Sequence, residues 1–293
     1  MEPKVEFAKV RDFGEIISDS FLFIRENFKP LISAFFTFCG IFLVVGAVVA
    51  IMQQFKMADV YNGQVMSPRN RMSDIFGAEY FLTLLFSILS ITAIMVTTLA
   101  FITLYREKGN IAPTNEEIWG YFKYYYLKIF GSTLISIVIG FIGFILCVIP
   151  GIYLYPILGL IFPIMMVENT SYGYAFSKSF KLIKNNWWLV FGSLFIMGLI
   201  VSIAMGIAVA PFSVTSFIDT LLNPQKGLQI SKPMAVVAVI VGQICHALYV
   251  LPFVTLALCY FSVSERKEGT GLLDRINQLG TNDADKNLPA EEY

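Results

Sequence analysis

The sequence has little charge and almost no histidine. Only 14% of its residues are Asp, Glu, Lys or Arg, whereas an average soluble domain carries about 25%. A surface that faces water on all sides needs more polar residues than this, so the composition excludes an ordinary soluble domain. The only histidine, His246, also excludes a metal centre or a catalytic relay that needs two imidazoles.

Catalytic motifs are missing as well. The sequence contains no His-Glu-x-x-His pair, no Gly-x-Ser-x-Gly elbow and no phosphate-binding glycine-rich loop. Four cysteines lie in apolar segments without the spacing of metal ligands, and they are interpreted as small buried residues. They are Cys39, Cys147, Cys245 and Cys259. We therefore expect a protein that is not an enzyme and carries no cofactor.

Long apolar runs are what the sequence has in abundance. Five uncharged runs reach the ~20 residues that a membrane-spanning helix needs. The run 129–167 would form a helix of about 58 Å, roughly twice the hydrocarbon thickness. Pro150 and Gly151 predict a tight turn that divides it, because proline lacks an N–H and glycine accepts the turn. The expected fold is an all-α integral membrane protein with six spans, at 30–52, 80–104, 129–149, 152–167, 188–210 and 234–262.

Positive charge is distributed unevenly around these spans. Lysine and arginine favour the cytoplasmic side of a membrane. With the N-terminus inside, the outer segments hold few of the 21 basic residues, namely Lys56, Arg69, Arg71, Lys226 and Lys232. Both termini are therefore predicted to be cytoplasmic, in a bacterial cytoplasmic (inner) membrane. We expect one polytopic membrane domain over residues 1–280 and an acidic disordered tail over 281–293. The net charge of zero gives no basis for binding nucleic acid.

An internal repeat precedes the spans. The stretch "SDSFLFIRENF" (18–28) aligns with "SKSFKLIKNNW" (177–187), and a fainter third copy lies at 119–132. Each copy stands before a span whose predicted entry is cytoplasmic. The chain is therefore predicted to contain three units, each an interfacial amphipathic helix followed by two spans.

Helical periodicity supports the amphipathic segments. Apolar residues recur at i, i+4, i+7 and i+11 in two copies, which places them on one narrow stripe. They are Ile17, Phe21, Ile24 and Phe28, and then Phe176, Phe180, Ile183 and Trp187. Capping-box spacing at Asp12 and Glu15, and at Thr114 and Glu117, predicts where two of the helices start. Such helices are expected to lie on the inner membrane surface with their lysines reaching phosphates.

These segments supply the predicted binding surface for membrane lipids or a membrane-protein partner. It comprises Lys178, Lys181, Lys184, Trp187, Trp188, Arg25, Asn27 and Asn186. The tryptophans are interpreted as interfacial anchors rather than as a ligand cage. Within the spans, Gln243 and His246 form a candidate polar site one helical turn apart. We interpret it as a helix–helix hydrogen bond, with a proton site as the alternative.

One stretch carries a family resemblance. "VIPGIYLYPILGLIFPIMMVENTSYGYAFSKSFKLIKNNWWLVFG" (148–192) resembles the bacterial multi-pass membrane domain found fused to some glycerophosphodiester phosphodiesterases. The Ile-Pro-Gly turn and the Asn-Trp-Trp stretch carry the likeness. The resemblance implies a standalone member without the catalytic domain, so no catalytic residue is carried over.

Two classes of function stay open. The first is a non-catalytic membrane protein that binds lipid or a partner protein through amphipathic helices on the cytoplasmic surface. The alternative is a permease or lipid-moving transporter, favoured by the repeat and by the prolines Pro156 and Pro163 in the fourth span. The spans contain no Asp, Glu, Lys or Arg, which argues against a pump or a proton-coupled carrier.

Overall fold

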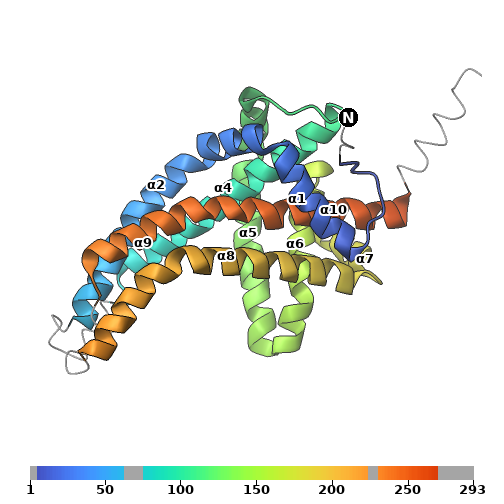
Figure 1. The fold of residues 1–293 in the computed structure, drawn as a ribbon. Helices are drawn as coiled ribbons and strands as arrows, with labels where there is room; N and C mark the ends of the chain where they lie inside the picture. Colours follow the sequence, from blue (N-terminus) through green and yellow to red (C-terminus); the bar gives the residue numbers. More distant parts are fainter. Residues whose placement is uncertain (1–4, 63–74, 224–229, 270–293) are drawn as a thin grey trace, which may run out of the picture.

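The computed structural model describes residues 5–62, 75–223 and 230–269, which fold into helices joined by short connections (Figure 1). In chain order the helices are α1 (Phe13–Glu26), α2 (Phe28–Tyr61), α4 (Ala78–Glu107), α5 (Asn115–Leu146), α6 (Val148–Val167), α7 (Tyr172–Ile183), α8 (Trp187–Leu222), α9 (Lys232–Cys245), the 3-10 turn η2 (His246–Tyr249) and α10 (Val250–Glu268). The described residues contain no strand. The tail predicted at 281–293 lies outside the described residues.

Six helical stretches are long and apolar enough to cross a membrane. They are α2, α4, α5, α6, α8 and the stretch Lys232–Glu268. The predicted all-α multi-pass fold and the number of candidate spans are thereby confirmed. The predicted capping boxes at the starts of α1 and α5 are also confirmed. The Asp12 and Thr114 side chains accept from the backbone N–H groups of Glu15 and Glu117, three positions on, and the side chains of Glu15 and Glu117 accept from the backbone N–H groups of Asp12 and Thr114.

Four of the candidate spans lie side by side, and neighbouring ones run in opposite directions. They are α4, α2, the stretch formed by α9 and α10, and α8. Cys39 on α2 contacts Thr97 on α4, and Asp59 near the end of α2 pairs with Lys232 at the start of α9. α8 packs against both α9 and α10. Both α1 and α7 lie at the end of this group where α10 finishes (Figure 1). We call this the α7 end.

The α5–α6 hairpin leaves this arrangement and points away from the other long helices (Figure 1). Its turn lies at Cys147, so the turn predicted at Pro150 and Gly151 is wrong by a few residues. Cys147 has an extended backbone between the end of α5 and the start of α6. Pro150 stands in the first turn of α6, where a missing N–H costs no helical hydrogen bond.

Gly151 is needed for close packing rather than for the turn. A Cβ at Gly151 would lie 2.7 Å from Cδ2 of Phe144 and 3.1 Å from its Cα. A Cβ at Gly143 would lie 2.9 Å from Cδ1 of Leu154. The tip of the hairpin therefore depends on small residues that let the two backbones approach.

We expect Gly151→Ala to destabilise the protein by about 1–3 kcal/mol, because the added methyl group must push α5 and α6 apart. The matched control is Gly131→Ala in α5, where a Cβ would meet nothing within 4 Å. Alanine is also the better helix former. Thermal unfolding in detergent should show a lower melting temperature for Gly151→Ala alone. Equal melting temperatures would contradict the close packing of the hairpin.

The sixth span is two helices joined by η2. Pro252, near the start of α10, has no N–H to donate to the carbonyl of Leu248, so regular α-helical bonding fails in this region. The span predicted at 234–262 thus has a break close to its centre. This break places His246 and Tyr249 in a 3-10 turn.

Candidate functional site

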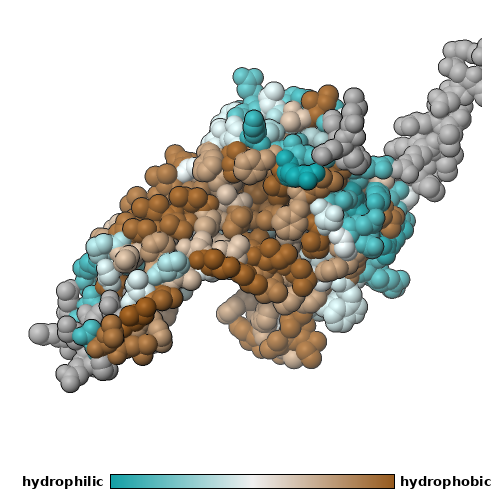
Figure 2. All heavy atoms as spheres, in the orientation of Figure 1, coloured by the Kyte–Doolittle hydropathy of each residue, from teal (hydrophilic) through white to brown (hydrophobic). Residues whose placement is uncertain are grey.

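Polar residues gather at the α7 end. On the face shown in Figure 2, hydrophilic residues gather around α7 and the end of α10, whereas most of the surface along the long helices is hydrophobic. The α7 end has three features: a buried arginine, a set of ion pairs around Lys178, and an exposed basic cluster beside an apolar groove.

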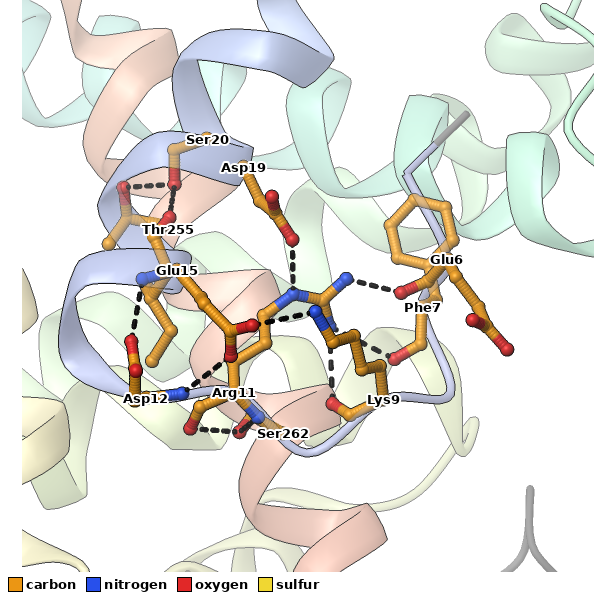
Figure 3. Close-up of polar contacts among 11 residues, drawn as sticks. Glu6, Phe7, Lys9, Arg11, Asp12, Glu15, Asp19, Ser20, Thr255 and Ser262 are labelled. Atoms are coloured by element: carbon orange, nitrogen blue, oxygen red, sulfur yellow. Dashed lines mark hydrogen bonds and ion pairs between the residues drawn. The ribbon is translucent and has the colours of Figure 1, made fainter. Parts of the chain in front are cut away.

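Arg11 is the hub of the N-terminal segment, and its side chain is fully buried. Its Nε donates to Oδ2 of Asp19 on α1 at 2.7 Å. Its other guanidinium nitrogens donate to backbone carbonyls of the segment before α1. Its own backbone N–H donates to Oγ of Ser262 on α10 at 2.9 Å (Figure 3). One side chain therefore ties the N-terminal segment and α1 together beside α10.

The helices α1 and α7, together with the residues that directly follow them, carry buried polar residues at matching positions. Ser20 and Ser179 are fully buried, and Asn27 and Asn186 are 5% exposed each. The hydroxyl of Ser20 bonds both the carbonyl of Ile16 and the hydroxyl of Thr255 on α10. The predicted apolar stripes are exposed only in part, and Ile183 is fully buried. Phe21, Phe28 and Phe180 are 43%, 56% and 37% exposed.

Lys178 does not belong to the exposed basic surface on which it was predicted. Its Nζ lies 2.9 Å from Glu168 Oε1 and 2.7 Å from Glu268 Oε1, and its side chain is 16% exposed. Glu168 also accepts from the hydroxyl of Tyr260 at 2.6 Å. The lysine charge is thus used to join α7 to the ends of α6 and α10. The sequence of α7 could not show this burial, because the two carboxylates come from the ends of other helices.

Four basic side chains form an exposed cluster at the α7–α8 connection. We call Lys181, Lys184, Arg266 and Lys267 the basic cluster; all four are exposed. Arg266 donates to the side-chain oxygen of Asn186 at 3.2 Å and Lys267 donates to the carbonyl of Lys181. These acceptors are neutral, so the contacts orient the cations without neutralising them. Arg25, the remaining predicted cation, is exposed on α1.

A row of stacked rings begins beside the basic cluster. Trp187 stacks on Phe191 with ring centroids 4.6 Å apart, and Phe191 stacks on Phe195 at 5.7 Å. Trp187 also stacks on Tyr153 of α6 and donates from Nε1 to its carbonyl at 3.1 Å. We call these four residues the aromatic row. Trp188 beside them is 78% exposed, as an interfacial anchor would be.

The aromatic row leads into an apolar groove between the hairpin and α8. This lateral groove has a volume of about 450 Å³, and its walls include Phe144, Ile152, Tyr155, Phe191, Phe195 and Gly198. A neighbouring cavity of about 280 Å³ shares Tyr155 and Leu194 with it. Figure 2 shows the surface hollowed between the hairpin and the rest of the molecule. No charged residue lines the groove among the residues described.

Gln243 and His246 have separate surroundings. His246 Nδ1 lies 2.9 Å from the carbonyl oxygen of Gly242, which is in the preceding helix α9, and its ring packs on Tyr249. Gln243 faces α2, where a Cβ at Gly46 would lie 3.7 Å from its Nε2. The hydrogen bond between His246 and Gly242 therefore lies within the sixth span and does not join it to another span. Throughout the described ranges no group of three His, Cys, Asp or Glu side chains could hold a metal ion.

The structure thus divides the predicted binding surface. It brings Lys181, Lys184, Trp187 and Trp188 together at the α7–α8 connection. It places Asn27, Asn186 and Lys178 in internal contacts. Arg266 and Lys267 were not among the predicted site residues, although the run "ERKE" at the end of the sixth span was a local signal. Nor was Arg11, for which no local signal exists because Ser262 is far away in sequence.

The fold and the site together define a multi-pass helical membrane protein in which the basic cluster and two tryptophans lie beside the apolar lateral groove. Comparison with known proteins adds no relative: no protein-family model matches the chain, and neither the curated proteins nor the solved structures contain a significant match.

Proposed function

We propose that this chain is a non-catalytic membrane protein that binds anionic membrane lipid at its cytoplasmic surface. The observation that carries the proposal is the basic cluster, whose four exposed cations gather at the α7–α8 connection, directly before the exposed Trp188 near the start of α8. Cations at a membrane surface attract anionic lipid by about 1 kcal/mol each, and indoles favour the same depth. A membrane-protein partner with an acidic surface is the alternative ligand.

The proposal includes an orientation. Both termini lie in the cytoplasm of a bacterium, so that the α7 end faces the inner leaflet of its cytoplasmic membrane. The charge distribution of the sequence supports this placement. The proposal also keeps the three-unit organisation. In its support, residues at equivalent positions of the first and last copies share the same burial, as Ser20 and Ser179 do. The resemblance to the phosphodiesterase-fused membrane domain is retained as a proposed relationship.

The double variant Lys181→Glu/Lys184→Glu tests the binding of anionic lipid. Two lysines contribute about 2 kcal/mol, so removing their charge corresponds to about 30-fold weaker binding of phosphatidylglycerol. The added carboxylates also repel the anionic lipid, so we expect native mass spectrometry to show a loss of more than about 30-fold for the double Lys→Glu variant. Binding of phosphatidylcholine should be unchanged. Added salt should weaken the wild-type interaction, since the Debye length is only ~8 Å at physiological ionic strength. The neutral variant Lys181→Gln/Lys184→Gln should show a smaller loss.

Two results would contradict the proposal. An unchanged lipid profile in the charge-reversed variant would remove anionic lipid as the ligand. Loss of a co-purified protein, with the lipid profile unchanged, would identify the basic cluster as a protein-docking surface.

A lipid-moving transporter remains the second candidate function, and the lateral groove favours it. The groove lies between the α5–α6 hairpin and α8, and its apolar walls could contact the acyl chains of a lipid in transit. Transfer of fluorescent lipid between the leaflets of reconstituted vesicles distinguishes the two functions. A binding protein should leave the rate of transfer at that of empty vesicles.

A further inference from the structure

We propose that the lateral groove holds one acyl chain of the anionic lipid whose headgroup the basic cluster binds. The inference rests on the proposed function and deepens it, because it assigns a place to the apolar part of the ligand. Three observations carry it: the chemistry of the groove walls, the continuity between the groove and the basic cluster, and the free space at Gly198.

The groove walls fit a hydrocarbon chain. They consist mainly of aromatic and aliphatic residues from α5, α6 and α8, and the two lining residues with polar side chains are Tyr155 and Ser202. All three helices belong to candidate membrane spans. In a membrane this surface is in contact with lipid rather than with water, and the apolar walls match the acyl region in polarity.

The path from the basic cluster to the groove is continuous. Lys184 stands three residues before Trp187, the first residue of α8. Trp187 stacks on Phe191, and Phe191 and Phe195 line the groove. The path therefore begins with cations, passes an indole and ends in an apolar groove. A phospholipid has the same order of properties, from its phosphate to its acyl chain. A free phosphate would use the cations alone.

Gly198 provides a variant that fills the groove without disturbing the packing. It lines the groove, and a Cβ there would meet nothing within 4 Å. We expect Gly198→Leu to place a side chain where the acyl chain lies. Gly206→Leu is the matched control: it lies on the same helix, a Cβ there also meets nothing within 4 Å, and it does not line the groove.

The experiment uses the full chain in bilayers that contain phosphatidylglycerol with a photoreactive group in one acyl chain. We expect cross-links in wild type to concentrate on peptides with residues 144–155 and 191–202. Gly198→Leu should reduce these cross-links and the lipid affinity about tenfold, because the chain loses its buried contacts. Gly206→Leu should behave as wild type does.

Failure of this inference is distinct from failure of the proposed function. If the lysine reversal abolishes lipid binding but Gly198→Leu leaves the cross-links unchanged, the headgroup site stands and the groove assignment is wrong. The same conclusion follows if wild-type cross-links are spread evenly over all lipid-facing helices. If the lysine reversal changes nothing, the proposed function itself fails. Inorganic phosphate competing as well as phosphatidylglycerol would show that the acyl chain contributes nothing and would also overturn the inference.

Discussion

Arg11→Met is expected to lower the stability of the folded protein by about 3 kcal/mol, which corresponds to roughly 6–12 °C in melting temperature. The guanidinium is fully buried and donates to Asp19 and to three backbone carbonyls. Methionine fills a similar volume but donates nothing, so the carboxylate and the carbonyls lose their donor. Thermal unfolding of the purified protein in detergent measures the effect.

Lys9→Met is the matched control for this prediction. It removes a cation from the same segment, but Lys9 and Glu15 are 44% and 41% exposed, and an exposed pair contributes less than about 1 kcal/mol. The second substitution Asp19→Asn should recover part of the loss in Arg11→Met, because it removes the unpaired carboxylate. If Arg11→Met were as stable as Lys9→Met, the N-terminal segment would not depend on this buried hub.

Lys178→Glu is expected to be the second most damaging change, with a loss of about 2–3 kcal/mol. It would bring a third carboxylate beside Glu168 and Glu268, which now lie 2.9 Å and 2.7 Å from the lysine nitrogen. Lys181→Glu makes the same charge change three residues further along α7, on an exposed side chain. Melting temperatures should fall for Lys178→Glu alone, while lipid binding should fall for Lys181→Glu.

The pH range of the Lys178 interaction follows from the pKa of this side chain. Burial works to lower the pKa of Lys178, but hydrogen bonds to Glu268 and Glu168 raise it above its ordinary value. A raised folded-state pKa means that the stabilisation is complete below the pKa of the unfolded chain. It is lost as the pH rises through the folded-state value. We therefore expect the difference between Lys178→Glu and wild type to persist across neutral pH. A difference that vanished at pH 7 would show that the lysine is not charged in the folded protein.

Local chemistry explains why several elements could be predicted correctly. The capping boxes at α1 and α5 depend on residues three positions apart, so sequence alone shows them. Pro150 and Gly151 correctly predicted a hairpin, yet the turn itself lies at Cys147. Its place depends on how closely Phe144 approaches Gly151 across the hairpin, which is a contact between helices.

The candidate site shows the same division. Lys181 and Lys184 could be recognised from helical periodicity, and the structure leaves them exposed. Lys178 has the same local pattern, but carboxylates from α6 and α10 enclose it. Sequence periodicity describes one helix and cannot show which residues of other helices pack on it.

The class of this protein follows from its sequence alone, because apolar run length and the absence of charge inside the runs are properties of single segments. Six candidate spans followed directly from them. Tertiary structure alone decided that Arg11 is buried, that Lys178 is paired, and that the α5–α6 hairpin leaves a groove beside α8. Each of these depends on residues far apart in the chain. Apolar helices that pack through nonspecific burial and small side chains leave little trace of their neighbours in the local sequence.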